Sequence, residues 1–309
     1  ARRNIAQLNQ PYQMLTLSNR AITRIKDRVK LSQDICDLAV DEGGFLLAWM
    51  GDLHENHVLP VSMSGKSEGY VETLNIDLNV ERYLEGPVVR SINERKVICI
   101  NNLKVEKGFL ALKDEALKRG FSSVASIPIF IGQQVVSVLV LYSDQENVFN
   151  PKLMQLLTNL SEDLSYAFSN LDLDMKRTEA EKRLLLLSSV VDQSADAVAI
   201  MNAKGLIEYV NPRFSRLTGY ELGDLKDLSP AILSSSKSEA DKFHKVFSDL
   251  SNGRKWKGEF HNRKKNGDVY WSMDTISPIK DNNGVIVQYV STSEDYTALK
   301  QAQDKIKHR

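Results

Sequence analysis

Four side chains in the last third of the sequence are of types that could hold a flat aromatic ligand: Trp256, Glu259, Asn262 and Trp271. They lie on two predicted strands that follow one another in the chain and are expected to be neighbours in a sheet. An indole can stack on a flavin ring, and an amide and a carboxylate could bind its polar edge. The simpler interpretation, which we favour, is that Trp256 fills the cleft of its domain and that Glu259 pairs with a nearby base such as Arg263.

No pattern in the chain predicts catalysis or a metal centre. The sequence contains no G-x-S-x-G, H-E-x-x-H or G-x-x-x-x-G-K-[ST] motif and no kinase or cyclase signature. His54 and His57 lie close together but fall in a polar turn, so we expect a solvated loop. Cys36 and Cys99 lie inside apolar patterns, which is typical of buried, reduced thiols in a cytosolic protein. We therefore expect a cytoplasmic protein with no disulfide.

The charge balance excludes several classes of partner. Lys plus Arg and Asp plus Glu both number 40, so the formal net charge is zero and no field attracts nucleic acid or anionic lipid. The longest apolar run, VVSVLVLY at 135–142, is far shorter than the ~20 residues that span a bilayer. The length of 309 residues indicates two domains. Because the first residues lack a methionine and the last stop inside a helical pattern, we expect a fragment of a longer protein.

The first half of the chain predicts an α+β domain in which helices pack on a mostly antiparallel sheet. The helical patterns cover 11–31, 31–40, 85–95 and 110–120. The strand patterns cover 45–51, 57–64, 97–103, 123–131 and 135–143. The last two strands flank Gly132, which is typical of a hairpin.

This half resembles a GAF domain. The resemblance rests on the strings GPVVRSINERKVICINNL and FLALKDEALKRGFSSVASIPIFIGQQVVSVLVLYS and on a helix after Asn150. It implies a ligand-sensing and dimerising module, since some members hold cyclic nucleotides, bilins or haem. No cysteine lies next to a histidine to attach a bilin. The N-K-F-D-E signature of cyclic-nucleotide-binding members is matched only loosely, at a different spacing, by Asn102, Lys104, Phe109, Asp114 and Glu115.

The second half predicts a five-stranded antiparallel sheet around a helical middle. The strand patterns cover 197–201, 206–210, 256–264, 269–280 and 285–295. A short helix begins at Asn211-Pro212, and a second one covers 238–250. Asn266-Gly267 and Asn282-Asn283-Gly284 are strong hairpin turns.

This half is similar to a PAS domain with its trailing strands. The similarity rests on the strings GLIEYVNPRFSRLTGYE, WKGEFHNRKKNGDVYW and ISPIKDNNGVIVQYVSTSEDYTALKQAQ. It implies a module that senses small molecules, redox state or light, dimerises, and transmits the change through flanking helices. Residues 294–297 and the helix after them resemble the D-I-T linker that leads from PAS domains into an output domain.

The resemblance also limits the cofactor. Light-oxygen-voltage photochemistry needs a cysteine beside the flavin, and the second half of the chain contains none, so that mechanism is excluded. Haem needs an axial ligand, and His244 lies on the right element, but Phe243 and Phe247 take the inward face. We therefore expect His244 in solvent and no haem. Flavin held without a covalent bond stays possible, because the segment 256–271 resembles flavin-holding redox members as well as members with no known ligand.

Residues 150–192 predict one long helix that joins the two domains. An apolar seam of the kind that a parallel partner helix would cover is formed by Leu153, Leu157, Leu160, Leu164, Ala167 and Leu171. Beyond Leu171 the register skips, and 172–183 is too polar for a domain core. We expect this part to bridge the domains through solvent or along a homodimer seam.

Together these patterns predict an α+β protein made of two PAS-like domains joined by a helix. The ranges are 1–171 for a GAF domain with an N-terminal helix, 172–190 for the linker helix, and 191–309 for a PAS domain with an output helix. We expect a non-catalytic sensory fragment of a bacterial signalling protein, acting as a homodimer on an output domain outside the chain. We expect that output domain to be a diguanylate cyclase, with a histidine kinase as the second candidate. The alternatives are an enzyme with an active site across the dimer and a structural dimerisation module without a ligand.

Overall fold

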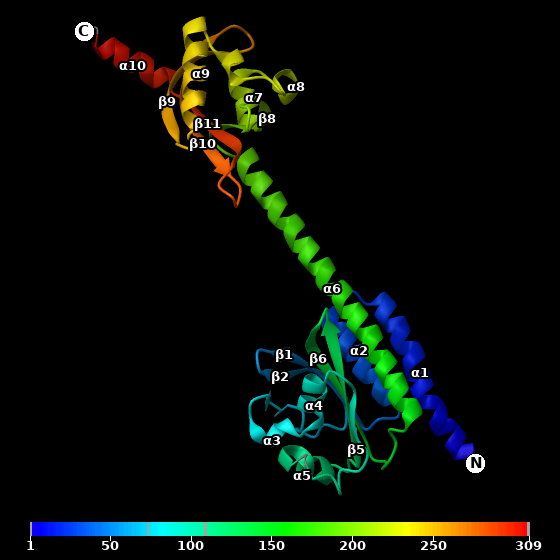
Figure 1. Ribbon diagram of the computed structural model, residues 1–309. Coiled ribbons are helices and arrows are strands. Elements are labelled where there is room, and N and C mark those ends of the chain that lie inside the picture. The colour runs from blue at the N-terminus through cyan, green and yellow to red at the C-terminus, as the bar shows by residue number, and fades with distance from the viewer. Residues whose placement is uncertain (1, 73, 108–109, 308–309) are drawn as a thin grey trace. The chain divides into compact units, whose positions relative to one another are not determined.

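The computed structural model describes residues 2–72, 74–107 and 110–307 and divides the chain into two compact units, Ala1–Thr178 and Glu179–Arg309. Each unit is an antiparallel sheet with helices against it (Figure 1). The predicted α+β fold class, with two sheets and a long helix that leads from one unit to the other, is confirmed. Over the described ranges, no helix is both long and apolar enough to cross a membrane.

The first unit contains a sheet in the order β3-β2-β1-β6-β5-β4, in which all neighbours are antiparallel. Its strands are β1 (Leu47–His54), β2 (His57–Gly65), β3 (Ile76–Asp77), β4 (Ile98–Ile100), β5 (Ser123–Ile131) and β6 (Gln134–Ser143). Its helices are α1 (Arg2–Arg24), α2 (Arg28–Asp41), α3 (Glu81–Leu84), α4 (Pro87–Glu94), α5 (Leu110–Lys118) and the first part of α6 (Pro151–Asp192). The patterns missed the short elements β3 and α3, which are too brief to show a period.

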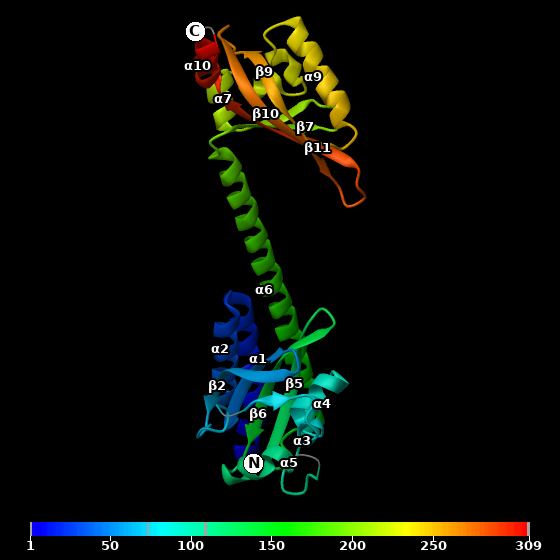
Figure 2. The same ribbon diagram turned by 90° about the vertical axis from the view of Figure 1, so that its left-hand side faces the viewer.

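Both faces of this sheet are covered, because its central strands are apolar on both sides. On one face, α1, α2 and α6 pack side by side and form a core with Met14, Ile35, Met50 and Leu139 (Figure 2). On the other face, α4 and α5 cover a second core that contains Trp49, Val89 and Ala116. The helix predicted at 11–31 extends too far, because α1 ends at Arg24 and α2 begins after Asp27. The side chain of Asp27 caps α2 by accepting from the backbone N–H of Lys30 at 2.7 Å.

Helix α6 begins as the sequence predicts, with Oδ1 of Asn150 accepting from the backbone N–H of Leu153 at 3.0 Å. The leucine seam in its first five turns, however, packs on the unit's own sheet, and its Leu153, Leu157, Leu160, Leu164 and Ala167 are buried. The spacing is the same for a helix that covers a sheet and for one that pairs with a second helix. Leu171 is only half-buried, and 173–188 are all exposed. The skip in register marks the point where α6 leaves the core.

The second unit contains a sheet in the order β8-β7-β11-β10-β9, again antiparallel throughout. Its strands are β7 (Ala197–Asn202), β8 (Ile207–Val210), β9 (Trp256–Arg263), β10 (Val269–Lys280) and β11 (Ile286–Asp295). Its helices are α7 (Pro212–Thr218), α8 (Leu222–Leu225), the 3-10 turn Pro230–Leu233, α9 (Lys237–Leu250) and α10 (Thr297–Lys307). Residues from α7, α8, the 3-10 turn and α9 pack on the inner face of the sheet and complete its single core.

Candidate functional site

Strand alternation separates the four side chains that the sequence nominated as ligand-binding. Trp256 and Asn262 lie on β9 with Phe260, on the face that packs on the core. Glu259 lies between them on the outer face, and Trp271 faces the opposite way from its buried neighbours on β10. The four residues therefore do not line one cavity.

Trp256 packs on the core rather than leaving a surface open for a ring. Its indole lies against Phe260, with ring centroids 4.9 Å apart and planes tilted by 39°. It also covers Gly258, where an added Cβ would come within 2.4 Å of the indole. This is the arrangement that the simpler interpretation of Trp256 requires.

Glu259 and Trp271 belong to a cluster that holds α10 on the outer face. Glu259 pairs with Lys300 at 2.9 Å, not with Arg263, whose guanidinium donates to backbone carbonyls. The ammonium of Lys300 lies 4.9 Å from the centre of the Trp271 ring. Thr297 Oγ1 accepts from the backbone N–H of Trp271 at 2.9 Å. We call Glu259, Trp271, Thr297 and Lys300 the exit anchor.

The exit anchor could be found from sequence only in part. The segment 294–297 resembled a linker motif, but Lys300 and Glu259 are 41 residues apart in the chain and no local pattern links them. The Lys300 ammonium keeps the pKa of the Glu259 carboxyl below its usual value. Both side chains are partly exposed, at 24% for Lys300 and 40% for Glu259, so the ion pair contributes little to stability. Its main effect is to fix the position of α10.

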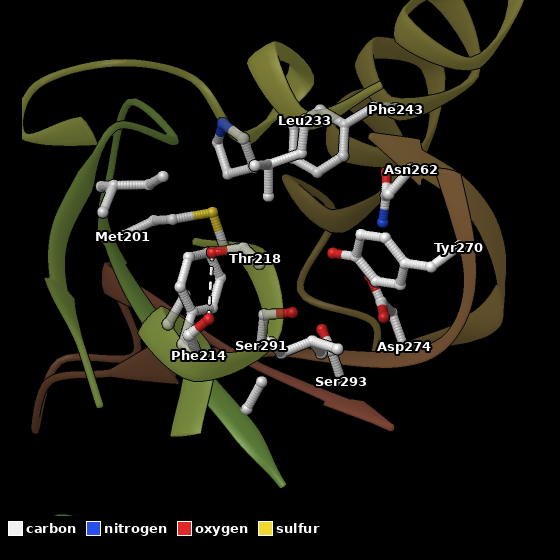
Figure 3. Close-up of a pocket in the computed structure, with 15 residues that line it drawn as sticks. Met201, Phe214, Thr218, Leu233, Phe243, Asn262, Tyr270, Asp274, Ser291 and Ser293 are labelled. Carbon is white, nitrogen blue, oxygen red and sulfur yellow. Dashed lines mark hydrogen bonds between the residues drawn. The ribbon is translucent and has the colours of Figure 1, made fainter. Parts of the chain in front are cut away.

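A small cavity lies between the sheet and the helices of the second unit. Its volume is about 30 Å³, which is room for one or two water molecules. Most of its wall is apolar. It is lined by Ala197, Ala199, Met201, Ile207, Phe214, Leu217, Thr218, Pro230, Leu233, Phe243, Asn262, Tyr270, Asp274, Ser291 and Ser293. Figure 3 shows Asn262, Tyr270 and Asp274 together on one side and Met201 and Phe214 on the other.

Asp274 is the exceptional residue of this cavity, and the sequence patterns did not single it out. It lies on β10, between β9 and β11, and is 7% exposed. Burial raises the pKa of its carboxyl to about 6, although Ser293 and Ser272 beside it act in the opposite direction. Asn262 Nδ2 donates to Ser272 Oγ at 2.9 Å, so one of the nominated residues lies on the Asp274 side of the cavity (Figure 3). The available signal was an acidic residue at an inward position of a strand.

Flavin does not fit the cavity. A three-ring cofactor is far larger than one or two water molecules, and the two tryptophans lie on opposite faces of the sheet. His244 is exposed, as expected from its inward-facing neighbours Phe243 and Phe247. Within the described ranges, no group of three or more His, Cys, Asp or Glu side chains could hold a metal ion.

The last turn of α6 is fastened to the second unit by Asn211, which is fully buried. Its Nδ2 donates to the carbonyls of Val191 and Asp196, at 3.0 Å each. Its Oδ1 accepts from the N–H groups of Val198 and Phe214, at 2.9 and 2.8 Å. One amide therefore joins α6, β7 and α7.

A second contact at this helix end joins Tyr209 on β8 to Asp192. The hydroxyl of Tyr209 donates to Oδ1 of Asp192 at 2.5 Å. Burial, followed by the carboxylate, raises the pKa of Tyr209 to about 12, so the hydroxyl keeps its proton at neutral pH. We call Asp192, Tyr209 and Asn211 the entry anchor.

The first unit contains an aromatic cluster where its sheet faces α4 and α5. Trp49, Tyr70, Phe121 and Tyr142 are buried there, and the hydroxyls of Tyr70 and Tyr142 are 3.1 Å apart. Of the residues that loosely match a cyclic-nucleotide signature, Phe109 lies outside the described residues. Two others form ion pairs within the unit, Lys104 with Glu146 and Glu115 with Arg119.

Comparison with protein families assigns both units. Residues 26–169 match the model of the GAF domain, and residues 195–298 match that of the PAS domain. The two domain types occur here in tandem, and both are sensory domains of regulatory proteins. The chain is also similar to single PAS domains of known structure, such as that of a protein from Colwellia psychrerythraea, with 23% identity and a TM-score of 0.35 over 37% of this chain and 98% of that one.

Curated relatives are signalling proteins that extend well beyond the aligned part. A nitrogen fixation regulatory protein of Klebsiella oxytoca is 28% identical over 110 residues, which cover 36% of this chain and 22% of the relative. The human high-affinity cAMP-specific and IBMX-insensitive 3′,5′-cyclic phosphodiesterase 8A is 31% identical over 126 residues, which cover 39% of this chain and 15% of the relative. The chain thus spans less than a quarter of either protein.

Proposed function

From a chain in which a GAF domain is followed by a PAS domain, we propose a non-catalytic sensory module that acts as a parallel homodimer on an output domain outside the chain. The observation that carries the proposal is the continuity of α6. Its first turns are part of the GAF core, and its last turn is held by the entry anchor of the PAS domain. A helix fixed at both ends can transmit a change of packing.

Strand alternation provides the route across the PAS domain. Tyr270 lines the cavity, and its neighbour Trp271 belongs to the exit anchor on the other face. On β9, Asn262 and Glu259 are divided in the same way. A ligand that shifts β9 or β10 on the inner face therefore displaces the contacts of α10 on the outer face. Such a ligand must bind the two arrangements with different affinity.

The exposed part of α6 carries a stripe that suits a second copy of the same helix. The side chains of Leu173, Leu184 and Leu187 are 62%, 68% and 57% exposed. Together with the exposed Ala180 and the half-buried Val191 they recur at spacings of seven, four, three and four, which are core positions of a coiled coil. We call these five residues the α6 stripe.

Charge on either side of the α6 stripe favours a parallel pair. With Leu187 at position d, Lys176 occupies position g and Glu181 the following position e. In a parallel dimer these positions face each other across the seam, so Lys176 of one copy meets Glu181 of the other. An antiparallel pair would lose this match.

The test is the mass of the full chain in solution by light scattering. We expect a dimer for the native chain and a monomer for Leu184→Glu/Leu187→Glu, which places charges in the seam. The matched control is Leu185→Glu/Leu186→Glu, because these two leucines are equally exposed, at 70% and 64%, but point away from the stripe. The control should remain a dimer. A native chain that is monomeric at high concentration, or two variants that behave alike, would refute the proposal.

A further inference from the structure

The PAS cavity contains a carboxyl group without a full set of partners. Asp274 is 7% exposed and lines the cavity, yet its Oδ1 has no hydrogen-bond partner among the described residues. A buried polar atom left unpaired costs free energy, and more when the group is charged. Most such atoms in native proteins are satisfied by the protein's own groups, by ordered water or by a bound molecule.

Among the described residues that line the cavity, none is a cation that could pair with this carboxyl. Lys242 on α9 favours the ionised form, but its ammonium donates to the carbonyl of Glu259 at 2.6 Å and lies over the Phe260 ring. Tyr270, on the same strand, is a neutral phenol whose pKa is raised by burial. Asp295 on β11 adds a further negative charge near Tyr270. At neutral pH the ionised Asp274 therefore gives the cavity a negative charge, and none of its lining residues is a Lys, Arg or His that could balance it.

The rest of the wall restricts the size and kind of molecule that could balance this charge. The volume of about 30 Å³ admits two non-hydrogen atoms at most. The aromatic side chains of Phe214, Phe243 and Tyr270 contribute to the wall (Figure 3). Aromatic faces attract ammonium groups, and a carboxylate accepts their N–H donors.

We propose that this cavity binds a small ammonium-type cation, ammonium or methylammonium, with an N–H group donating to Oδ1 of Asp274. Ser293 lies near Asp274, with Ser291 next to it (Figure 3), and their hydroxyls supply further acceptors. The inference rests on the proposed sensory function only in making this cavity the input site. It gives that site a ligand class that neither the domain family nor the relatives specify.

The test measures heat stability of the PAS domain within the full chain at pH 7.5. Methylammonium, ammonium, potassium and sodium chlorides are compared at equal ionic strength. We expect a saturable rise of several degrees in the transition temperature with the two ammonium ions and none with sodium. Potassium is the decisive control, because it matches ammonium in charge and size but donates no hydrogen bond. Equal stabilisation by potassium and ammonium would overturn the proposal.

Two variants assign the effect to the cavity. Asp274→Asn removes a buried charge, so it should fold and should lose the response, with at least tenfold weaker methylammonium binding by calorimetry. Asp268→Asn changes an exposed acid of a turn and should respond like the native chain. An unaltered response in Asp274→Asn would overturn the assignment, and so would no response in the native chain.

Failure of this inference and failure of the sensory relay can be told apart. The monomeric variant Leu184→Glu/Leu187→Glu leaves the cavity intact and should still bind methylammonium. Binding without a native dimer would remove the relay but keep the ligand class. A native dimer that binds no amine would keep the relay and remove the proposed ligand class.

Discussion

Asn211 offers the most direct test of how the PAS domain holds the end of α6. We expect Asn211→Ala to destabilise the PAS domain strongly, because the amide makes four hydrogen bonds and is fully buried. Each such bond contributes roughly 1 kcal/mol net, and the backbone groups left without the amide would be hard for water to reach. The expected loss in the free energy of unfolding is therefore about 4 kcal/mol. Asn211→Asp keeps both acceptor bonds but turns a carboxylate toward two carbonyls. We therefore expect it to lower the free energy of unfolding by at least half as much as Asn211→Ala does.

The assay is urea denaturation of the full chain, read domain by domain through hydrogen exchange and mass spectrometry. Exchange should accelerate in the last turn of α6, in β7 and in α7, and remain unchanged in the GAF core. Asn266→Ala is the control, because its side chain forms hydrogen bonds with its near neighbour Asp268 in an exposed turn. It should cost less than about 1 kcal/mol. A loss below about 1 kcal/mol for Asn211→Ala would refute the role given to the amide, as would equal loosening of both domains.

Three further outcomes follow from the PAS domain. Gly205→Ala should cost several times more than Gly284→Ala in urea denaturation: both have a positive φ, near 80°, worth about 1 kcal/mol, but only at Gly205 would the added Cβ meet a ring, that of Phe247, at 2.4 Å. The raised pKa of Asp274, about 6 against 3.8, means that the folded state holds its proton more tightly. In buffers without amines, the native chain should therefore lose about 3 kcal/mol relative to Asp274→Asn as the pH rises from about 4 to about 6, and a flat difference would contradict this. Because the pKa of Glu259 is lowered, its ion pair with Lys300 stabilises α10 at pH values above the ordinary carboxyl pKa, and this contribution is lost as the pH falls through the lowered pKa. Glu259→Gln should therefore speed hydrogen exchange in α10 at pH 7 but not in strong acid.

Much of the fold could be predicted because its signals are local. Asn150 and Pro151 start α6, and Gly219 ends α7 in the left-handed conformation, with φ of 76°. The hairpin turns at Asn266-Gly267 and Asn282-Asn283-Gly284 set the borders of β9, β10 and β11. These choices depend on the backbone preferences of a few neighbouring residues.

The candidate site was predicted less well, because its members are distant in sequence. Trp256, Glu259, Asn262 and Trp271 have suitable chemistry, but alternation places two on each face of the sheet. The sequence patterns did not identify Asp274, because a single acidic residue at an inward position of a strand has no local signature. Its raised pKa, and the absence of a hydrogen-bond partner for Oδ1 among the described residues, depend on what β9, β11 and α9 place around it.

By itself, the sequence determined the two domain types, the succession of strands and helices, and the existence of one helix between them. Only the tertiary structure decided which side of α6 is covered, that Glu259 meets Lys300 and not Arg263, and that the PAS cavity is small and acidic. The physical reason is that periodicity records which residues avoid water but not what they pack against. A leucine seam on α6 satisfies the same rule against its own sheet as against a second helix.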